Sequence, residues 1–237
     1  RTLKDIYKEE FDSYKSYVMD IKEHPVLGNQ KGSKARDTKP FKVEQKDIPL
    51  SSMRGVDYDD EKWEEFINQI SFRSQENKDQ IGKLLAYGAY NTGKLDAIGK
   101  FSTQEFDGPN GYSTFGLKKD WKWCTYASQT ITACTFNPRL AYQRGYNIGQ
   151  EGLANGVQGL YAPGMNLHRS PFGGRNGEYV SEDPYITGKF SADLMSGCAD
   201  GGVYMYMKHF ALNEQESNRQ EMLMTWANEQ TIREIYL

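Results

Sequence analysis

The first part of the chain shows apolar side chains at helical spacing in separate segments. Residues 1–22 carry an apolar side chain every three or four positions, which predicts one amphipathic helix. A second helix is expected after the capping candidates Asp59 and Asp60, and a third over residues 79–87. The apolar face of the second helix is formed by Trp63, Phe66, Ile67 and Ile70. Residues 24–49 are polar and contain three prolines, so they are expected to form a linker or an arm that lies on another domain.

From about residue 97 onward, short apolar runs alternate with helical patterns. Helices are expected to begin at Asn137-Pro138 and at Asp183-Pro184. The four predicted strands lie in AIGKFSTQEF (97–106), ITACTF (131–136), GLYAPGMNL (159–167) and VYMYM (203–207). Strands that alternate with helices predict right-handed crossovers and a parallel sheet. The fold class is therefore expected to be α/β, and four strands are too few to close an eight-stranded barrel.

Charged side chains stand where three of these predicted strands end. Asp107 follows the first, His168-Arg169 follows the third, and Lys208-His209 follows the last. Because loops after parallel strands open on one face, we expect these groups to meet there. Asp107 taken alone could instead cap the turn of the following Gly-Pro.

Composition and charge narrow the class of ligand. The chain has 237 residues, net charge −3 and a pI near 5.7. It contains no block of like charges, so nucleic acid and anionic membranes are not expected partners. Aromatic residues make up 13% of the chain, and such rings can serve as stacking platforms for sugars, although most Tyr side chains pack as half-buried core. A neutral or small polar ligand fits these numbers best.

Metal, nucleotide and cofactor sites are not expected. His168 and His209 lack a third ligand at metal spacing, and Lys208 would repel a cation. The run GGRN (173–176) has neither the Walker nor the dinucleotide spacing. Glu182 and Asp183 are expected to have a structural role at a helix start.

The cysteines and the apolar runs indicate in which cellular compartment the protein is expected. The chain has three cysteines and no C-x-x-C pair, which favours a reducing compartment, so a cytoplasmic location is expected. No apolar run approaches the ~20 residues of a membrane span. Secretion stays open, because the chain begins at Arg1 without a methionine and an internal or processed piece would carry no signal.

Four motifs together resemble glycoside hydrolase family 3, which includes many β-glucosidases. They are DGPNG, NLHRSPFGGRNGEYVSEDP, KHFALNEQESNR and TIREIYL, and their order and spacing match over residues 97–237, with a similar lead-in over 51–96. The resemblance implies that residues 51–237 are part of a (β/α)8 TIM-type barrel, about the first half of its strands, preceded by a helical and irregular extension over residues 1–50. It also implies that the rest of the barrel and a second α/β domain, from the same parent or another chain, complete the protein.

The resemblance also assigns roles to individual residues. It implies that the glycone is bound by Asp107, Arg175, Lys208, His209 and Arg219. It implies a supporting role behind these groups for Arg169 and Glu178. A sugar hydroxyl both donates and accepts hydrogen bonds, so one carboxylate among several cationic donors suits it. This chain departs from many relatives at Tyr112-Ser113, where they have an aliphatic residue and Arg.

The implied function is that of a retaining β-glycosidase, which hydrolyses terminal non-reducing β-linked sugars with two carboxyl groups. The resemblance places the nucleophilic Asp and the acid/base Glu outside this chain, so the chain alone is expected to be incomplete and inactive. One alternative is a non-catalytic carbohydrate-binding or regulatory domain derived from the same family. A further alternative is an unrelated barrel enzyme for a phosphorylated ligand.

The backbone at Lys208-His209 is expected to be irregular. Adjacent side chains of a regular strand point to opposite faces, so both residues can reach one sugar only through a bulge or a cis peptide. The cis form is the one that the resemblance implies. Asp107 is expected to be held ionised by Lys208 and Arg175.

Overall fold

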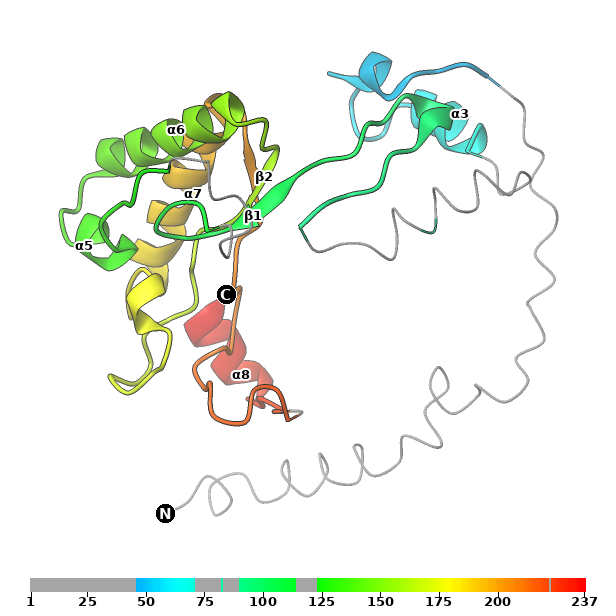
Figure 1. Cartoon of the computed structure of the whole chain (residues 1–237). Helices are drawn as coiled ribbons and strands as arrows, with labels where there is room; N and C mark the ends of the chain where they lie inside the picture. Colours follow the sequence, from blue (N-terminus) through cyan, green and yellow to red (C-terminus); the bar gives the residue numbers. More distant parts are fainter. Residues whose placement is uncertain (1–45, 71–81, 83–89, 114–122, 222) are drawn as a thin grey trace, which may run out of the picture. The chain divides into compact units, whose positions relative to one another are not determined.

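The computed structural model describes residues 46–70, 82, 90–113, 123–221 and 223–237, which belong to one compact unit, Gln45–Leu237 (Figure 1). The helices predicted over residues 1–22 and 79–87 lie outside the described residues, apart from position 82. Most of the predicted arm over residues 24–49 lies outside them as well.

This unit contains a three-stranded parallel sheet. Its strands are β1 (Glu105–Asp107), β2 (Gly159–Tyr161) and β3 (Tyr204–Met205), in the order β1-β2-β3. Both pairs are parallel, and Leu160 lies opposite Phe106 on one side and Met205 on the other. Helix α6 (Pro138–Ala154) connects β1 to β2, and α7 (Pro184–Asp200) connects β2 to β3. The predicted α/β class and parallel sheet are confirmed.

The strand predicted over residues 131–136 is wrong. This segment lies in helix α5 (Gln129–Ala133) and the turn after it. The Ser128 hydroxyl accepts a hydrogen bond from the Ile131 amide at 3.3 Å, and the Thr132 hydroxyl donates to the Ser128 carbonyl at 3.3 Å. These local bonds favour a helical turn over a strand, and an apolar run this short has no period that distinguishes the two.

The two long helices begin where the sequence predicts. The Asn137 side chain accepts from the Leu140 amide at 3.2 Å, and the Asp183 side chain accepts from the Ile186 amide at 2.8 Å. A proline follows each capping residue. Proline has no N–H group, and it suits the first helical position because an N–H there would have no partner within the helix. Asp183 therefore has the structural role that was expected.

Helices α6 and α7 pack side by side at a very short distance (Figure 1). Glycines make this approach possible: a Cβ added at Gly145 would stand 1.9 Å from the Leu194 carbonyl oxygen, and one at Gly197 would stand 2.0 Å from that of Tyr142. The close pair forms a layer that covers one face of the sheet.

The two faces of the sheet differ in chemistry. On one face, the strand residues Phe106, Leu160 and Met205 pack in the same core cluster as Ile148 of α6 and Cys198 of α7. The opposite face centres on Glu105, which is 1% exposed. Its carboxylate accepts hydrogen bonds from the hydroxyls of Tyr161 at 2.9 Å, Tyr204 at 2.9 Å and Tyr206 at 3.0 Å. A buried carboxylate is costly unless it accepts hydrogen bonds, and the three tyrosine hydroxyls provide them.

Shorter elements complete the described unit. Helix α3 (Lys62–Asn68) confirms the predicted second helix, and the Asp60 carboxylate accepts from the Lys62 amide at 2.9 Å. The other short elements are η1 (Leu50–Met53), η2 (Asp96–Ile98), η3 (Asn176–Glu178), α8 (Glu229–Thr231) and η4 (Ile232–Tyr236). Within the described ranges, no helix combines the length and the apolar character that crossing a membrane requires.

Candidate ligand-binding site

Charged side chains from distant segments meet beyond the carboxyl ends of the strands. Asp107 ends β1, and the Lys208 ammonium forms an ion pair with its carboxylate. Lys208 also lies 3.8 Å from Glu178 Oε2. The side chains of Asp107 and Lys208 are 24% and 17% exposed, so the pair is poorly screened by water.

Arg175 joins this pair to further groups. Its Nε forms an ion pair with the Glu178 carboxylate, and its Nη1 lies 3.7 Å from Glu216 Oε1. Glu216 Oε2 in turn accepts from Arg219 Nε at 2.8 Å. Arg219 is 54% exposed and marks the rim. The seven connected side chains, called the charge cluster below, are Asp107, Arg175, Glu178, Lys208, His209, Glu216 and Arg219.

The backbone at Lys208-His209 brings both side chains into the charge cluster. The peptide bond between them is cis, which confirms the expected irregularity. The Lys208 amide donates to the Pro163 carbonyl at 2.9 Å, and the Met165 amide donates to the Lys208 carbonyl at 2.7 Å. From this position Lys208 reaches Asp107, while His209 Nε2 lies 3.3 Å from Arg175 Nη1.

Helix α5 holds the segment that carries Glu178. The Gln129 side chain is fully buried, and its amide donates to the carbonyls of Gly164 at 2.8 Å and Glu178 at 2.7 Å. Thr130 donates to the Tyr179 carbonyl at 2.8 Å. No pattern in the sequence points to Gln129, because a lone glutamine next to a segment predicted as a strand follows no spacing rule.

Arg144 of α6 holds the turn after Asp107. Its Nη2 donates to the Pro109 carbonyl at 3.0 Å and to Asn110 Oδ1 at 3.2 Å, while its Nη1 donates to the Ala127 carbonyl at 2.6 Å. Burial lowers the pKa of Arg144 to about 10, but this value is still well above neutral pH, so the guanidinium stays charged. The Asp107 turn is thus attached to the same helix layer as the rest of the sheet.

The charge cluster contains most of the residues to which the resemblance assigns a role. Asp107, Arg175, Lys208, His209 and Glu178 are in direct contact, and Arg219 joins them through Glu216. Arg169 is exposed, and its charge acts on Tyr236 instead. Among the described residues no ion pair joins Arg169 to the charge cluster.

Two positions near the site have no part in the predicted binding set. The departure from relatives at Tyr112 lies on the helix side of the sheet, where the Tyr112 hydroxyl donates to the Ile148 carbonyl at 3.1 Å. Tyr179 was not predicted, although its hydroxyl lies 2.8 Å from His209 Nδ1. Its place beside Glu178 in the motif GEYVSED is the only sequence signal that points to it.

The charges of the charge cluster act on His209. Burial, together with the charges of Arg175 and Lys208, lowers the pKa of His209, so the imidazole is neutral at neutral pH. The cluster therefore offers donors from two cations and a neutral ring close to the Asp107 carboxylate. Within the part of the chain that the structure describes, no group of three His, Cys, Asp and Glu side chains is close enough to hold a metal ion.

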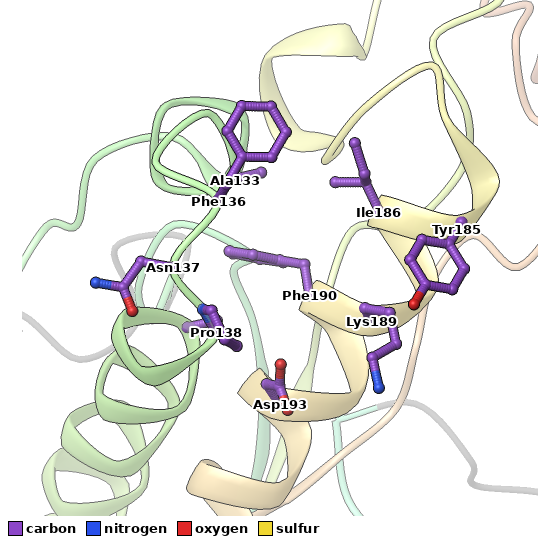
Figure 2. A pocket seen from close by; sticks show the side chains of 10 residues that line it. Ala133, Phe136, Asn137, Pro138, Tyr185, Ile186, Lys189, Phe190 and Asp193 are labelled. Atoms are coloured by element: carbon purple, nitrogen blue, oxygen red, sulfur yellow. The ribbon is translucent and has the colours of Figure 1, made fainter.

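An apolar cavity lies elsewhere, between the starts of α6 and α7. It encloses about 220 Å³. Figure 2 shows Ile186 and Phe190 of α7 on one side of it, and Phe136 and Pro138 on the other. No residue of the charge cluster lines this cavity, and its walls carry little of the polarity that a sugar ring requires.

Known proteins resemble this chain over a segment that carries the charge cluster apart from Asp107. Residues 124–237 match the family model for the glycosyl hydrolase family 3 N terminal domain. Over 108 residues the chain is 45% identical to a β-glucosidase of Ruminococcus albus. The aligned stretch covers 46% of this chain and 11% of that protein.

Solved structures give the same result. A β-glucosidase from Paenibacillus barengoltzii superposes with a TM-score of 0.66 at 29% identity, over 85% of this chain and 22% of that one. A glycoside hydrolase family 3 β-glucosidase from Neurospora crassa superposes with a TM-score of 0.54 at 34% identity, over 62% of this chain and 18% of that one. The chain thus spans less than a quarter of the length of these relatives. As the motifs predicted, residues 124–237 are a segment of the glycosyl hydrolase family 3 N-terminal domain.

Proposed function

We propose that the charge cluster is the glycone-binding subsite of a retaining β-glycosidase that acts on terminal, non-reducing β-linked sugars such as glucosides. The observation that carries the proposal is the meeting of three distant segments at the strand ends: Lys208 pairs with Asp107, and His209 lies against Arg175. Glu178 links the two pairs through Arg175 and Lys208. Strand ends of a parallel sheet are where such folds bind ligands.

The chemistry of the charge cluster suits vicinal hydroxyls. The Asp107 carboxylate can accept hydrogen bonds from two hydroxyl groups, while Lys208 and Arg175 donate to the oxygens of the same groups. Lys208 forms an ion pair with this carboxylate, so the proposed role of Asp107 is to bind hydroxyl groups and not to act as the acid catalyst. Arg219 at the rim would contact the ligand from the open side.

The architecture proposed around this site is a (β/α) barrel. Strands β1 to β3, with α6 and α7 on one face, would form part of that barrel within residues 51–237, and residues 1–50 would precede it as an extension. Glu105 with its three tyrosine donors would then lie in the barrel interior beneath the site. A second α/β domain is the proposed partner that completes the cleft.

We place the nucleophile and the acid/base outside the charge cluster. Each of its carboxylates, on Asp107, Glu178 and Glu216, forms an ion pair with Lys or Arg. A retaining mechanism needs one carboxylate free to attack and another that carries a proton. These three carboxylates are therefore not assigned to catalysis, and this chain alone is expected to be incomplete and inactive.

The test is the variant Asp107→Asn in the full-length protein, assayed with an aryl β-glucoside. Loss of a charged hydrogen bond to the sugar should lower kcat/KM by about a hundredfold. The matched control is Asp96→Asn, which removes an exposed aspartate that pairs with Lys94 at 2.8 Å, and it should leave kcat/KM unchanged. Near-normal kcat/KM in Asp107→Asn would refute the assigned role. Binding of glucose without any hydrolysis by the full-length protein would point instead to a non-catalytic carbohydrate-binding domain.

A further inference from the structure

A buried polar network lies behind His209, on the side away from Arg175. Tyr179 is 1% exposed, and its hydroxyl oxygen lies 2.8 Å from His209 Nδ1. The Asn213 side-chain amide donates to the same oxygen at 2.7 Å. The Asn213 backbone amide donates to Asn166 Oδ1 at 2.9 Å, and Asn166 is fully buried. The network thus joins three segments, which carry Asn166, Tyr179 and residues 209–213.

The donors and acceptors of this network determine where the phenol hydrogen goes. An amide NH2 group can only donate, so the contact with Asn213 occupies a lone pair of the phenol oxygen. Burial raises the pKa of Tyr179, so the phenol keeps its hydrogen. Among the described residues, His209 Nδ1 is the acceptor that stands within hydrogen-bond distance of that hydrogen. Tyr179 therefore donates to Nδ1, which must carry a lone pair.

The contact on the opposite side of the ring could favour the other tautomer. Arg175 Nη1 lies 3.3 Å from His209 Nε2, and it could donate there if the ring hydrogen were on Nδ1. Arg175, however, already donates through its Nε to the Glu178 carboxylate, and its Nη1 forms a looser ion pair with Glu216 Oε1 at 3.7 Å. The phenol hydrogen, in contrast, has His209 Nδ1 as its acceptor. The phenol contact is also shorter by half an ångström, and hydrogen bonds weaken with distance.

We propose that Tyr179 is a positioning residue that holds His209 neutral with its ring hydrogen on Nε2, the nitrogen on the charge-cluster side, so that this N–H donates to a hydroxyl oxygen of the bound sugar. The identity of the ligand rests on the proposed function, but the tautomer does not. Tyr179 contacts no part of the ligand itself in this arrangement and acts through the ring of His209.

The charges that face the ring agree with a neutral imidazole. Arg175 and Lys208 both disfavour a further positive charge, and the opposing carboxylates of Glu178 and Glu216 are paired with arginines. A charged ring would also place a donor at Nδ1 against the phenol, which would then have to turn its hydrogen away into the protein interior. Such an unpaired buried hydrogen is costly.

The test reads the tautomer of His209 directly by NMR. The chain contains three histidines, so 15N-histidine labelling gives few signals, and the variant His209→Gln assigns the one of interest. The nitrogen that bears the hydrogen is identified from the 15N chemical shifts of the ring. In the sugar-free protein we expect the Nε2–H form. In Tyr179→Phe, Arg175 becomes the remaining partner, and the Nδ1–H form should become substantially populated.

A matched control separates this effect from a general loss of a buried hydroxyl. Tyr112→Phe removes a buried phenol hydroxyl that donates to the Ile148 carbonyl at 3.1 Å and does not hydrogen-bond His209. This variant should leave the tautomer of His209 unchanged. Tyr179→Phe should also weaken glucose binding by about tenfold, because the ring donor is then present only part of the time.

An Nδ1–H tautomer in the unmodified protein would overturn the proposal, and this result does not depend on whether Tyr179→Phe folds. An unchanged tautomer in folded Tyr179→Phe would overturn it as well. If the Nε2–H form is found but glucose does not bind, the proposed function fails and the role of Tyr179 in setting the tautomer stands. The two ideas are therefore tested by different readouts.

Discussion

Arg144 should contribute more to stability than any exposed arginine of the same helix. Its guanidinium donates on one side to the Ala127 carbonyl and the Thr132 hydroxyl, at 2.6 and 2.7 Å, and on the other side to Pro109 and Asn110, at 3.0 and 3.2 Å. In Arg144→Lys, the single ammonium can reach only one of these two sides. About two hydrogen bonds from a charged donor are lost, at about 1.5 kcal/mol each, so the free energy of unfolding should fall by about 3 kcal/mol.

Urea denaturation followed by tryptophan fluorescence measures this change. The matched control is Arg139→Lys at the exposed start of the same helix, which should change the free energy of unfolding by less than about 0.5 kcal/mol. Arg144→Lys should also weaken sugar binding, because the freed turn carries Asp107. A loss of less than about 1 kcal/mol would show that the recorded hydrogen bonds do not hold the turn, and the reasoning would be refuted.

Two further predictions concern the helix pair and the histidine. Gly197→Ala should lower the melting temperature by several degrees, because its Cβ would lie 2.0 Å from a backbone carbonyl oxygen. In the control Gly188→Ala, in the same helix, the added Cβ meets no atom within 4 Å, so this variant should be slightly more stable. Equal melting temperatures for the two variants would contradict this prediction. Burial and the charges of Arg175 and Lys208 lower the pKa of His209 below its usual value of 6.5, so the unfolded state binds a proton more readily. The free energy of unfolding should therefore fall as the pH drops below about 6.5. Urea titrations at several pH values should show a smaller fall in this free energy for His209→Gln than for the unmodified protein. The same pH dependence in both proteins would contradict the prediction.

The helix starts could be predicted from the sequence because their causes are local. Asn137-Pro138 and Asp183-Pro184 each combine a capping side chain with a proline, and both act within three residues of the helix start. The strand predicted over residues 131–136 failed for the same kind of reason. The cap at Ser128 outweighed an apolar run that was too short to show a period.

The supporting residues of the site could not be predicted, because their partners lie far away along the chain. Gln129 donates to carbonyls 35 and 49 residues later, and Arg144 donates to the turn 34 and 35 residues earlier. A single glutamine or arginine carries no spacing rule for such contacts. Only the packing of α5 and α6 against the loops shows what these side chains hold.

The sequence by itself determined the alternation of strands and helices, the polar residues at the strand ends and the motifs of the family. The tertiary structure decided which of these residues touch: Lys208 reaches Asp107 across 101 positions, and Tyr179 reaches His209 across 30. Parallel pairing of β1, β2 and β3 brings the strand ends to one edge, and that register is a property of the whole sheet. The structure also shows that Arg169, to which the resemblance assigns a supporting role, is exposed and that its charge acts on Tyr236.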